Sequence, residues 1–227
     1  MKKVIYNKID KRSVAKMTTE SFPGRIIVVT TEDEAEKAVN FLLSQEILGI
    51  DTETRPSFKK GKQYKVALLQ VSTHDTCVLF RLNYTGMTKS IIKLLEDVKV
   101  PKIGLSLHDD VLSMHRRAEF KPGNFIDLQK HVGEIGIEDL SLQKLYANFF
   151  NKKISKAQRL TNWEADILSD RQKVYAATDA WACIKLYEEL MKLEETGNYE
   201  LRIIKDENTG REAVSSKQEN DNILNEK

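Results

Sequence analysis

Residues 47 to 54 have the sequence Ile47-Leu48-Gly49-Ile50-Asp51-Thr52-Glu53-Thr54, an apolar run that ends in two acids. The run predicts a β-strand, and because side chains alternate between the faces of a strand, Asp51 and Glu53 point the same way. Two neighbouring acids repel each other, so a divalent cation between them would make the arrangement tolerable. The alternative, which holds for most isolated pairs of this kind, is a strand that simply emerges into solvent at Asp51.

Other predicted elements precede and follow this strand. Short runs of β-forming residues predict further strands over residues 25–30, 64–73, 76–80, 102–105 and 124–126. Helical spacing of apolar residues predicts helices over residues 31–42, 87–98, 106–118, 140–150 and 169–193. Strands that come first, followed by alternating strands and helices, indicate an α/β fold with a mixed sheet flanked by helices.

The composition is that of a globular protein, with 41% hydrophobic and 31% charged residues in a chain of 227. No apolar run approaches the roughly 20 residues that cross a bilayer, so we expect no membrane partner. The start also lacks the long apolar segment of a secretory signal.

A net charge of +2 neither demands nor excludes an anionic partner. Two cysteines, Cys77 and Cys183, have no metal-ligand spacing and are too few for a disulfide framework, so we expect a cytoplasmic location.

We divide the chain into three parts. Residues 1–24 mix Lys, Thr and Ser with one Pro-Gly pair, and predict a basic, loosely structured lead-in. Residues 25–204 carry the predicted strands and helices. Residues 205–227 contain ten charged residues and only four aliphatic ones. That is too little apolar surface to offset the entropy of ordering, so we predict a disordered charged tail.

A second candidate acid lies at the start of the predicted helix over residues 106–118. Ser106 and Asp109 resemble an N-capping pair. In helical projection, Asp110 lies about 60° from the middle of the apolar stripe, whereas Asp109 lies on the far side. Asp110 is therefore the acid that can reach a site at the sheet. His108-Asp109 also resembles the metal-binding pair of HD phosphohydrolases, a hypothesis that requires a further His and a further Asp elsewhere in the chain.

A third candidate lies in the predicted helix over residues 169–193. Ser169 and Gln172 form a capping box that predicts its start. Tyr175 and Asp179 are four residues apart, so they share one face of a largely buried helix, and a buried acid and phenol need partners. The plain alternative is a buried Tyr–Asp hydrogen bond without further function.

Together, the three segments resemble the DEDD superfamily of 3′–5′ exonucleases in its tyrosine-bearing (DEDDy) branch. Within that branch the chain is most similar to the ribonuclease D and Werner-syndrome exonuclease domains, over residues 26–193. The matching segments are Gly49-Ile50-Asp51-Thr52-Glu53, residues 104–110, Asn162-Trp163, Leu168-Ser169 and Tyr175-Ala176-Ala177-Thr178-Asp179-Ala180.

The resemblance implies a ribonuclease H-like fold with a mixed five-stranded sheet. It also implies a metal-dependent enzyme that uses two divalent cations, Mg²⁺ or Mn²⁺, to remove nucleotides from the single-stranded 3′ end of DNA or RNA. Asp51 would bridge both ions, with Glu53 and Asp179 holding the ion that activates water. Asp110 would help to hold the second ion, Tyr175 would orient the water, and Glu53 would also contact the terminal 3′-hydroxyl.

Elementary chemistry agrees with these roles. Four carboxylates without His or Cys suit Mg²⁺ or Mn²⁺ better than zinc. A phenol with a pKa of about 10 is neutral at pH 7, so Tyr175 suits the positioning of water better than its deprotonation. The alternative to an enzyme is a catalytically inactive relative that only binds nucleic acid.

Substrate contacts are expected from the loop over residues 55–65, which has five positive charges and two aromatic residues. Such a loop can neutralise phosphates and stack bases, although a solvated surface loop explains it equally well. The predicted substrate-binding residues are Glu53, Arg55, Lys59, Lys60, Lys62 and Tyr64. Lys153, Lys156 and Arg159 are further candidates to face the strand, whereas we expect Trp163 to be a core aromatic residue.

Overall fold

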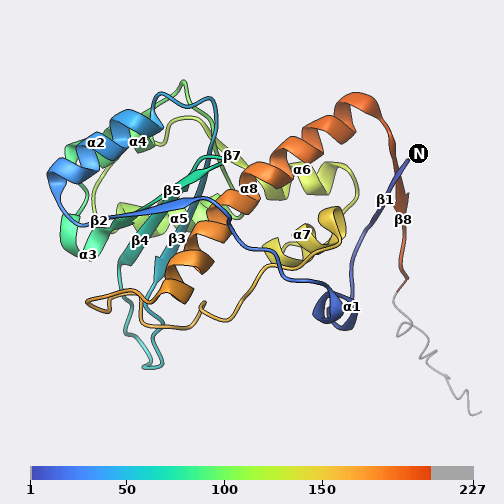
Figure 1. Ribbon diagram of the computed structural model, residues 1–227, viewed down its shortest axis with the longest axis horizontal. Coiled ribbons are helices and arrows are strands. Elements are labelled where there is room, and N and C mark those ends of the chain that lie inside the picture. Colours follow the sequence, from blue (N-terminus) through green and yellow to red (C-terminus); the bar gives the residue numbers. More distant parts are fainter. Residues whose placement is uncertain (1, 206–227) are drawn as a thin grey trace, which may run out of the picture.

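The computed structural model describes residues 2–205 and contains a six-stranded sheet and a two-stranded sheet, with helices around them (Figure 1). The large sheet consists of β2 (Arg25–Val29), β3 (Leu48–Thr54), β4 (Val66–Ser72), β5 (Thr76–Arg81), β6 (Lys102–Gly104) and β7 (Phe125–Asp127). Their spatial order is β2-β5-β4-β3-β6-β7. Strand β4 is antiparallel to both of its neighbours, and the remaining pairs are parallel, so the sheet is mixed.

Helices lie on both faces of this sheet. They are α1 (Lys11–Lys16), α2 (Glu32–Leu42), α3 (Leu82–Thr85), α4 (Lys89–Glu96), α5 (Leu107–His115), α6 (Leu128–Glu134), α7 (Leu142–Phe150) and α8 (Asp170–Thr196). The long helix α8 crosses one face, where it contacts β3 to β6, and α6 and α7 pack against it (Figure 1). Helices α2 and α4 lie together on the opposite side (Figure 1). The predicted α/β architecture is therefore confirmed.

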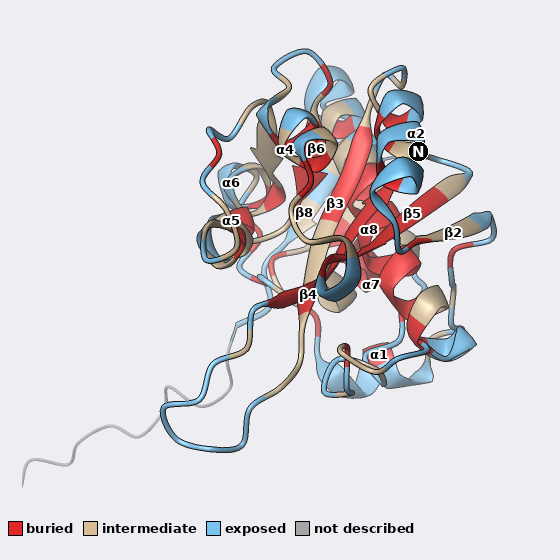
Figure 2. Ribbon diagram, turned by 90° about the vertical axis from the view of Figure 1, so that its left-hand side faces the viewer, coloured by how far each residue is buried: buried red, intermediate tan, exposed pale blue. Residues whose placement is uncertain are grey.

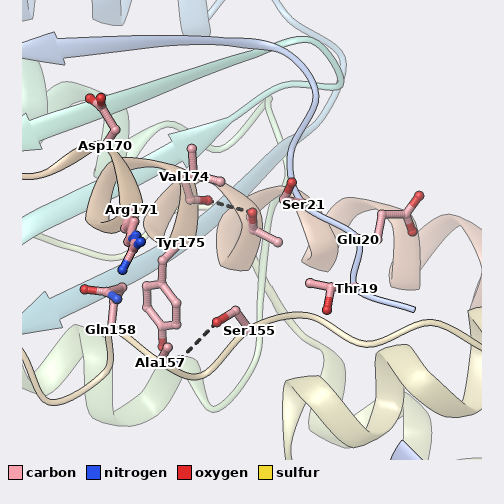
Figure 3. A pocket seen from close by; sticks show the side chains of 11 residues that line it. Thr19, Glu20, Ser21, Ser155, Ala157, Gln158, Asp170, Arg171, Val174 and Tyr175 are labelled. Atoms are coloured by element: carbon pink, nitrogen blue, oxygen red, sulfur yellow. Dashed lines mark hydrogen bonds between the residues drawn. The ribbon is translucent and has the colours of Figure 1, made fainter. Parts of the chain in front are cut away.

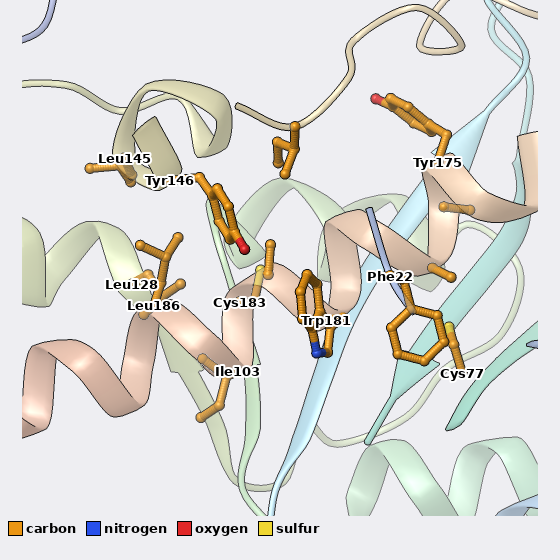
Figure 4. Packing of buried hydrophobic residues seen from close by; sticks show 14 of the residues in the cluster. Phe22, Cys77, Ile103, Leu128, Leu145, Tyr146, Tyr175, Trp181, Cys183 and Leu186 are labelled. Carbon is orange, nitrogen blue, oxygen red and sulfur yellow. The ribbon is translucent and has the colours of Figure 1, made fainter. Parts of the chain in front are cut away.

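Two hydrophobic clusters correspond to the two faces. In one cluster α8 packs against the sheet and against α7, with Trp181 and Cys183 between Tyr146 and Phe22 (Figure 4). The other cluster joins α2, α4 and α5 to the far side of the sheet and includes Ile50. The central strands and the inner side of α8 are buried, whereas the loop between β3 and β4 extends into solvent (Figure 2). The strands thus present one face to α8 and the other to the smaller helices.

The first 24 residues correct one prediction, because the part that the structure describes is ordered rather than loosely structured. Residues 3–6 form β1 (Lys3–Tyr6), which pairs in parallel with β8 (Tyr199–Arg202) in the two-stranded sheet. Helix α1 packs on α7 through Val14 and Ala147. These elements depend on partners about 130 to 200 residues away in the chain, so local patterns do not reveal them. The predicted tail lies outside the described residues, except for Lys205.

Further differences concern the number of elements. The resemblance implies five strands, but the three-residue strand β7 adds a sixth at the edge of the sheet, beside β6. Helices α3 and α6 were not predicted, because four and seven residues are too few for a clear apolar period.

No helix in the described part of the chain is both long and apolar enough to cross a membrane. Both cysteines are free and buried.

Candidate active site

Strand β3 and helix α8 approach each other closely because residue 49 has no side chain. A Cβ atom at Gly49 would lie 1.9 Å from the carbonyl oxygen of Ala180 in α8, a distance that no real contact shows. Asp51 comes two residues after Gly49 on the same face of β3, and Asp179 immediately precedes Ala180. The close contact between backbones therefore brings two carboxylates from distant parts of the sequence together.

Three carboxylates form the centre of the candidate site. Asp51, Glu53 and Asp179 each offer an oxygen atom, and these atoms all lie within 4.8 Å of one another. Glu53 and Asp179 are each only 8% exposed, and Asp51 is partly buried. The structure thus places Asp51 and Glu53 side by side, as the alternation along the strand predicts, and adds Asp179 from α8.

Asp110 lies next to this group on α5. Its carboxylate accepts a hydrogen bond from the hydroxyl group of Thr52 in β3, and the side chain is partly buried. Its neighbours His108 and Asp109 are exposed. The helical phase correctly distinguishes the two adjacent acids, and the exposed His108-Asp109 pair does not form a buried metal centre in the described structure.

The start of α5 is fixed by a residue that sequence patterns did not single out. The Asp127 carboxylate accepts hydrogen bonds from the backbone N–H groups of Ser106 and Leu107, at 2.9 Å and 2.8 Å. It also accepts one from Gln129 at the start of α6. Ser106 has a left-handed conformation (φ 63°) and its side chain makes no capping bond, so the predicted local pair with Asp109 is wrong. The real cap comes from the end of β7, about 20 residues away in the chain.

Burial and mutual repulsion shape the electrostatics of these acids. Burial first, and then the charges of Asp110, Asp179 and Glu53, raise the pKa of Asp51 well above its ordinary value. Burial, with the charges of Asp179 and Asp110, raises the pKa of Glu53 to about 9, against which Arg159 acts. Without a cation the group therefore retains protons, whereas a divalent cation would replace them and favour the ionised form.

The remaining two acids are shifted less. Burial raises the pKa of Asp179 to about 7, while a hydrogen bond with Tyr175 and the charge of Lys156 lower it. Burial raises the pKa of Asp110 to about 6, while the hydrogen bond from Thr52 lowers it. The acids thus share a strongly perturbed environment, which is typical of functional sites.

Tyr175 is held in place by core packing. The side chain is 6% exposed, and its ring centroid lies 5.9 Å from that of the fully buried Trp163. Trp163 is therefore the core aromatic residue that we expect, and its ring packs against the ring of Tyr175. The pKa of Tyr175 is raised by burial and by the charge of Asp179, so its hydroxyl group stays protonated.

A hollow of about 280 Å³ opens over the carboxylates. Asp51, Asp179 and Tyr175 line it together with Lys156 and Arg159 from the segment between α7 and α8. A second hollow, of about 510 Å³, lies against another side of Tyr175, where residues 155–158 pass close to its ring (Figure 3). Lys156 and Arg159, which the sequence indicates only as possible substrate contacts, thus line the hollow over the carboxylates.

The predicted substrate-binding loop over residues 55–65 forms a separate hollow of about 480 Å³. Arg55 forms an ion pair with Glu164 at 3.3 Å, and its guanidinium carbon lies 4.9 Å from the ring centroid of Tyr64. The ammonium group of Lys62 lies 4.7 Å from the same centroid. The side chains of Arg55 and Lys62 therefore already contact the ring of Tyr64. The other aromatic residue of the loop, Phe58, is 86% exposed.

The other predicted loop cations, Lys59 and Lys60, are exposed. Lys59 lines the loop hollow, whereas Lys60 is absent from its described lining. Among residues 2–205, none lines both this hollow and the one over the carboxylates. Of the predicted substrate-binding residues, the structure thus brings only Glu53 into the carboxylate group.

Comparison with known proteins agrees with this geometry. A family model described as 3′–5′ exonuclease matches residues 26–195. The bifunctional 3′–5′ exonuclease/ATP-dependent helicase WRN of Mus musculus is 29% identical over 185 residues, which are 77% of this chain and 13% of that protein. Ribonuclease D of Haemophilus influenzae is 29% identical over 173 residues, which are 75% of this chain and 42% of that protein. The chain thus spans less than half the length of either relative.

The fold is also found among solved structures. The EXO domain of Aedes aegypti Nibbler superposes with a TM-score of 0.71 at 19% identity, covering 80% of this chain and 95% of that one. The residues that match the family model, 26–195, include β3, α5 and Asp179 of α8, which carry the carboxylates. The resemblance predicted from three short motifs is therefore confirmed, and the chain belongs to the 3′–5′ exonuclease family.

Proposed function

We propose that this chain hydrolyses phosphodiester bonds at the 3′ end of a nucleic acid, releasing one nucleotide at a time with the help of two divalent cations, Mg²⁺ or Mn²⁺. One observation carries the proposal: oxygen atoms of Asp51, Glu53 and Asp179 lie within 4.8 Å of one another, and Asp51 and Asp179 line a hollow together with Tyr175 and Arg159. Family membership supports the direction of cleavage.

The residues present fit hard divalent cations. The donor set consists of carboxylate oxygens, and its burial without enough positive charge raises the pKa of each acid. Such ligands match the preference of Mg²⁺ and Mn²⁺ for oxygen. Asp51, Glu53 and Asp179 would hold one ion, and Asp51 with Asp110 would hold the second. When bound, the two ions would neutralise charge on the phosphodiester, activate the attacking water and stabilise the leaving oxygen.

The remaining side chains would orient the reactants. The hydroxyl group of Tyr175 interacts with Asp179 and stays protonated, so it suits the positioning of the attacking water. Glu53 would also accept a hydrogen bond from the terminal 3′-hydroxyl group. Lys156 and Arg159 line the same hollow and are placed to neutralise the phosphate under attack.

Both DNA and RNA present this scissile group, and the two relatives differ in what their names state: one is a ribonuclease, and the other combines an exonuclease with a helicase. We therefore propose a single-stranded 3′ end as the substrate and leave the sugar to experiment. The inactive nucleic-acid-binding alternative is not favoured, since all five motif residues are present and four acids meet in one place.

The test uses 5′-labelled single-stranded DNA and RNA incubated with Mg²⁺ or Mn²⁺. We expect a ladder of products that shorten from the 3′ end, and we expect EDTA and the substitution Asp51→Ala to abolish it. The exposed Asp109→Ala is the matched control and should retain the ladder. Binding of both oligonucleotides without shortening would support the inactive relative instead.

A second experiment tests the role of the phenol. Tyr175→Phe keeps the packing against Trp163 but removes the hydroxyl group, so turnover should fall about 100-fold, as for loss of one positioned hydrogen-bonding group. Its affinity for Mn²⁺ should stay within twofold of the wild type. Unchanged turnover would contradict the proposed positioning of water.

A further inference from the structure

A basic groove of about 840 Å³ lies where α1, the first turn of α7 and residues 153–160 meet. Its positively charged lining residues are Lys11, Lys144, Lys153, Lys156 and Arg159. Among residues 2–205, no acid lines this groove. A depression that contains only one sign of charge attracts a ligand of the opposite charge.

The walls of the groove are held by backbone contacts between distant segments. The N–H group of Lys153 donates to the carbonyl oxygen of Thr18 at 2.9 Å, and the N–H group of Glu20 donates to that of Lys153 at 2.8 Å. On the other side, Val14 of α1 is buried against Ala147 of α7. The N-terminal segment therefore supplies a fixed wall, and Lys11 stands at its exposed first helical position.

Most of these cations have no acidic partner. Lys144 forms an ion pair with Asp139 at 2.5 Å, but within the described residues Lys11, Lys153, Lys156 and Arg159 form none. Lys153 donates to the carbonyl oxygen of Ala15, and Lys156 to the hydroxyl group of Ser141 at 3.0 Å. Four positive charges around one groove thus have no ion-pair partner among the described residues, and only Lys156 and Arg159 lie in the field of the active-site acids.

Repulsion among these cations is visible in the properties of Lys156. Burial first, and then the charges of Arg159, Lys11 and Lys144, lower the pKa of its ammonium group, although Asp179 acts in the opposite direction. An anion in the groove would relieve this repulsion. The charge of Lys156 thus interacts both with Asp179 of the carboxylate site and with Lys11 of α1.

The groove is continuous with the candidate active site. Lys156 and Arg159 line both the groove and the hollow over the carboxylates, so an anionic chain can pass from one to the other. A single strand with one phosphate per nucleotide matches a row of cations that leads away from a phosphodiester-cleaving centre. The loop over residues 55–65 offers another basic path, but its hollow shares no described lining residue with the carboxylate site.

We propose that this groove binds the phosphates of the substrate strand on the 5′ side of the scissile bond, so that the strand leaves the active site past α1. The inference rests on the proposed function and adds the path of the strand to it. The N-terminal segment, which lies ahead of the family-matched residues 26–195, thereby becomes part of the substrate-binding surface.

The test compares two substrates that differ in their upstream phosphates: a single-stranded 12-mer, and the p-nitrophenyl ester of thymidine 5′-phosphate, which has none. The variant is Lys11→Glu. An acid in the first turn of a helix is favourable, so the substitution reverses one groove charge without weakening α1. Arg12→Glu is the matched control, because Arg12 is the next residue of the same turn, is exposed and does not line the groove.

We expect the ratio of kcat/KM for the 12-mer to kcat/KM for the ester to fall about fivefold or more in Lys11→Glu. In Arg12→Glu the ratio should stay within twofold of the wild type. An unchanged ratio in Lys11→Glu, or an equal fall in both variants, would overturn the inference. A larger fall in Lys59→Glu would also overturn it, in favour of the loop. If the wild type cleaves neither substrate, the proposed function itself fails.

Binding provides a readout that does not depend on turnover. In EDTA, the affinity of a labelled 12-mer should decrease with salt, and the slope of log affinity against log salt should be less steep by about 0.7 in Lys11→Gln, the value for one lost phosphate contact with a single strand. A slope equal to that of the wild type would show that Lys11 contacts no phosphate and would contradict the proposed path.

Discussion

Metal binding should release protons from the carboxylate site. Burial raises the pKa values of Glu53, Asp179 and Asp110 to about 9, about 7 and about 6, so the group holds at least one proton at pH 7 in the absence of metal. A cation that binds the ionised forms must therefore displace at least one proton from the three of them. Asp51, whose pKa is also raised, would add to this number.

Isothermal titration calorimetry with Mn²⁺ measures the release directly. The apparent binding enthalpy is recorded at pH 7 in several buffers that do not bind metal but differ in ionisation enthalpy. Its slope against that enthalpy gives the number of protons released, which should be at least one. At pH 6 the number should be larger, because a greater share of Asp179 and Asp110 is then protonated before the metal binds.

Two variants make the result specific. Asp179→Asn should reduce both the Mn²⁺ affinity and the proton release, whereas Asp109→Asn, at an exposed position on α5, should change neither. An apparent enthalpy that is independent of the buffer would refute the reasoning, because it would mean that the buried acids are already ionised without a cation.

The remaining predictions concern the parts that assemble the site. Asp110→Asn should lower exonuclease turnover about 100-fold, whereas its exposed neighbour Asp109→Asn should leave turnover within twofold; equal effects would contradict the placement of α5. Gly49→Ala should lower the free energy of unfolding by about 3 kcal/mol, measured in urea, since its Cβ would overlap the backbone of α8. Asp127→Ala should cost about 1–2 kcal/mol in the same assay, and no loss would exclude its capping role. Without metal, the free energy of unfolding should fall as the pH rises from about 4.5 to about 9, because folded Glu53 holds its proton more tightly than the unfolded chain; a flat pH profile would refute this.

Local periodicity was enough to predict which way the motif residues face. Alternation along β3 puts Asp51 and Glu53 together, and the helical phase separates Asp110 from Asp109. These predictions succeed because they depend only on the geometry of one element. The resemblance then supplied what periodicity lacks, namely that three distant segments belong to one site.

Interactions between distant segments were not predictable in the same way. Ser106 and Asp109 have the spacing of a local cap, but the N-terminus of α5 is capped by Asp127, which only the pairing of β6 with β7 brings near. The sequence of residues 1–24 predicts no regular structure, because the order of this segment depends on backbone pairing with residue 153 and with β8. Sequence patterns describe single elements, whereas these contacts depend on how the elements pack.

The loop over residues 55–65 shows the same limit for function. Its composition predicts that Tyr64 stacks on bases, yet Arg55 and Lys62 already contact that ring in the folded chain. Composition cannot tell a free aromatic face from one that neighbouring cations cover. Conversely, Lys11 gave no functional signal, because its place beside Lys156 follows only from the docking of α1 on α7.

Crystals grown with Mn²⁺ offer the most direct test of the idea that these carboxylates hold metal ions. Anomalous diffraction should show two manganese peaks in contact with the carboxylates, one shared by Asp51, Glu53 and Asp179 and one beside Asp51 and Asp110. A peak only at the surface group of His131, Glu134 and Glu194, or no peak at all at a saturating concentration, would contradict the account.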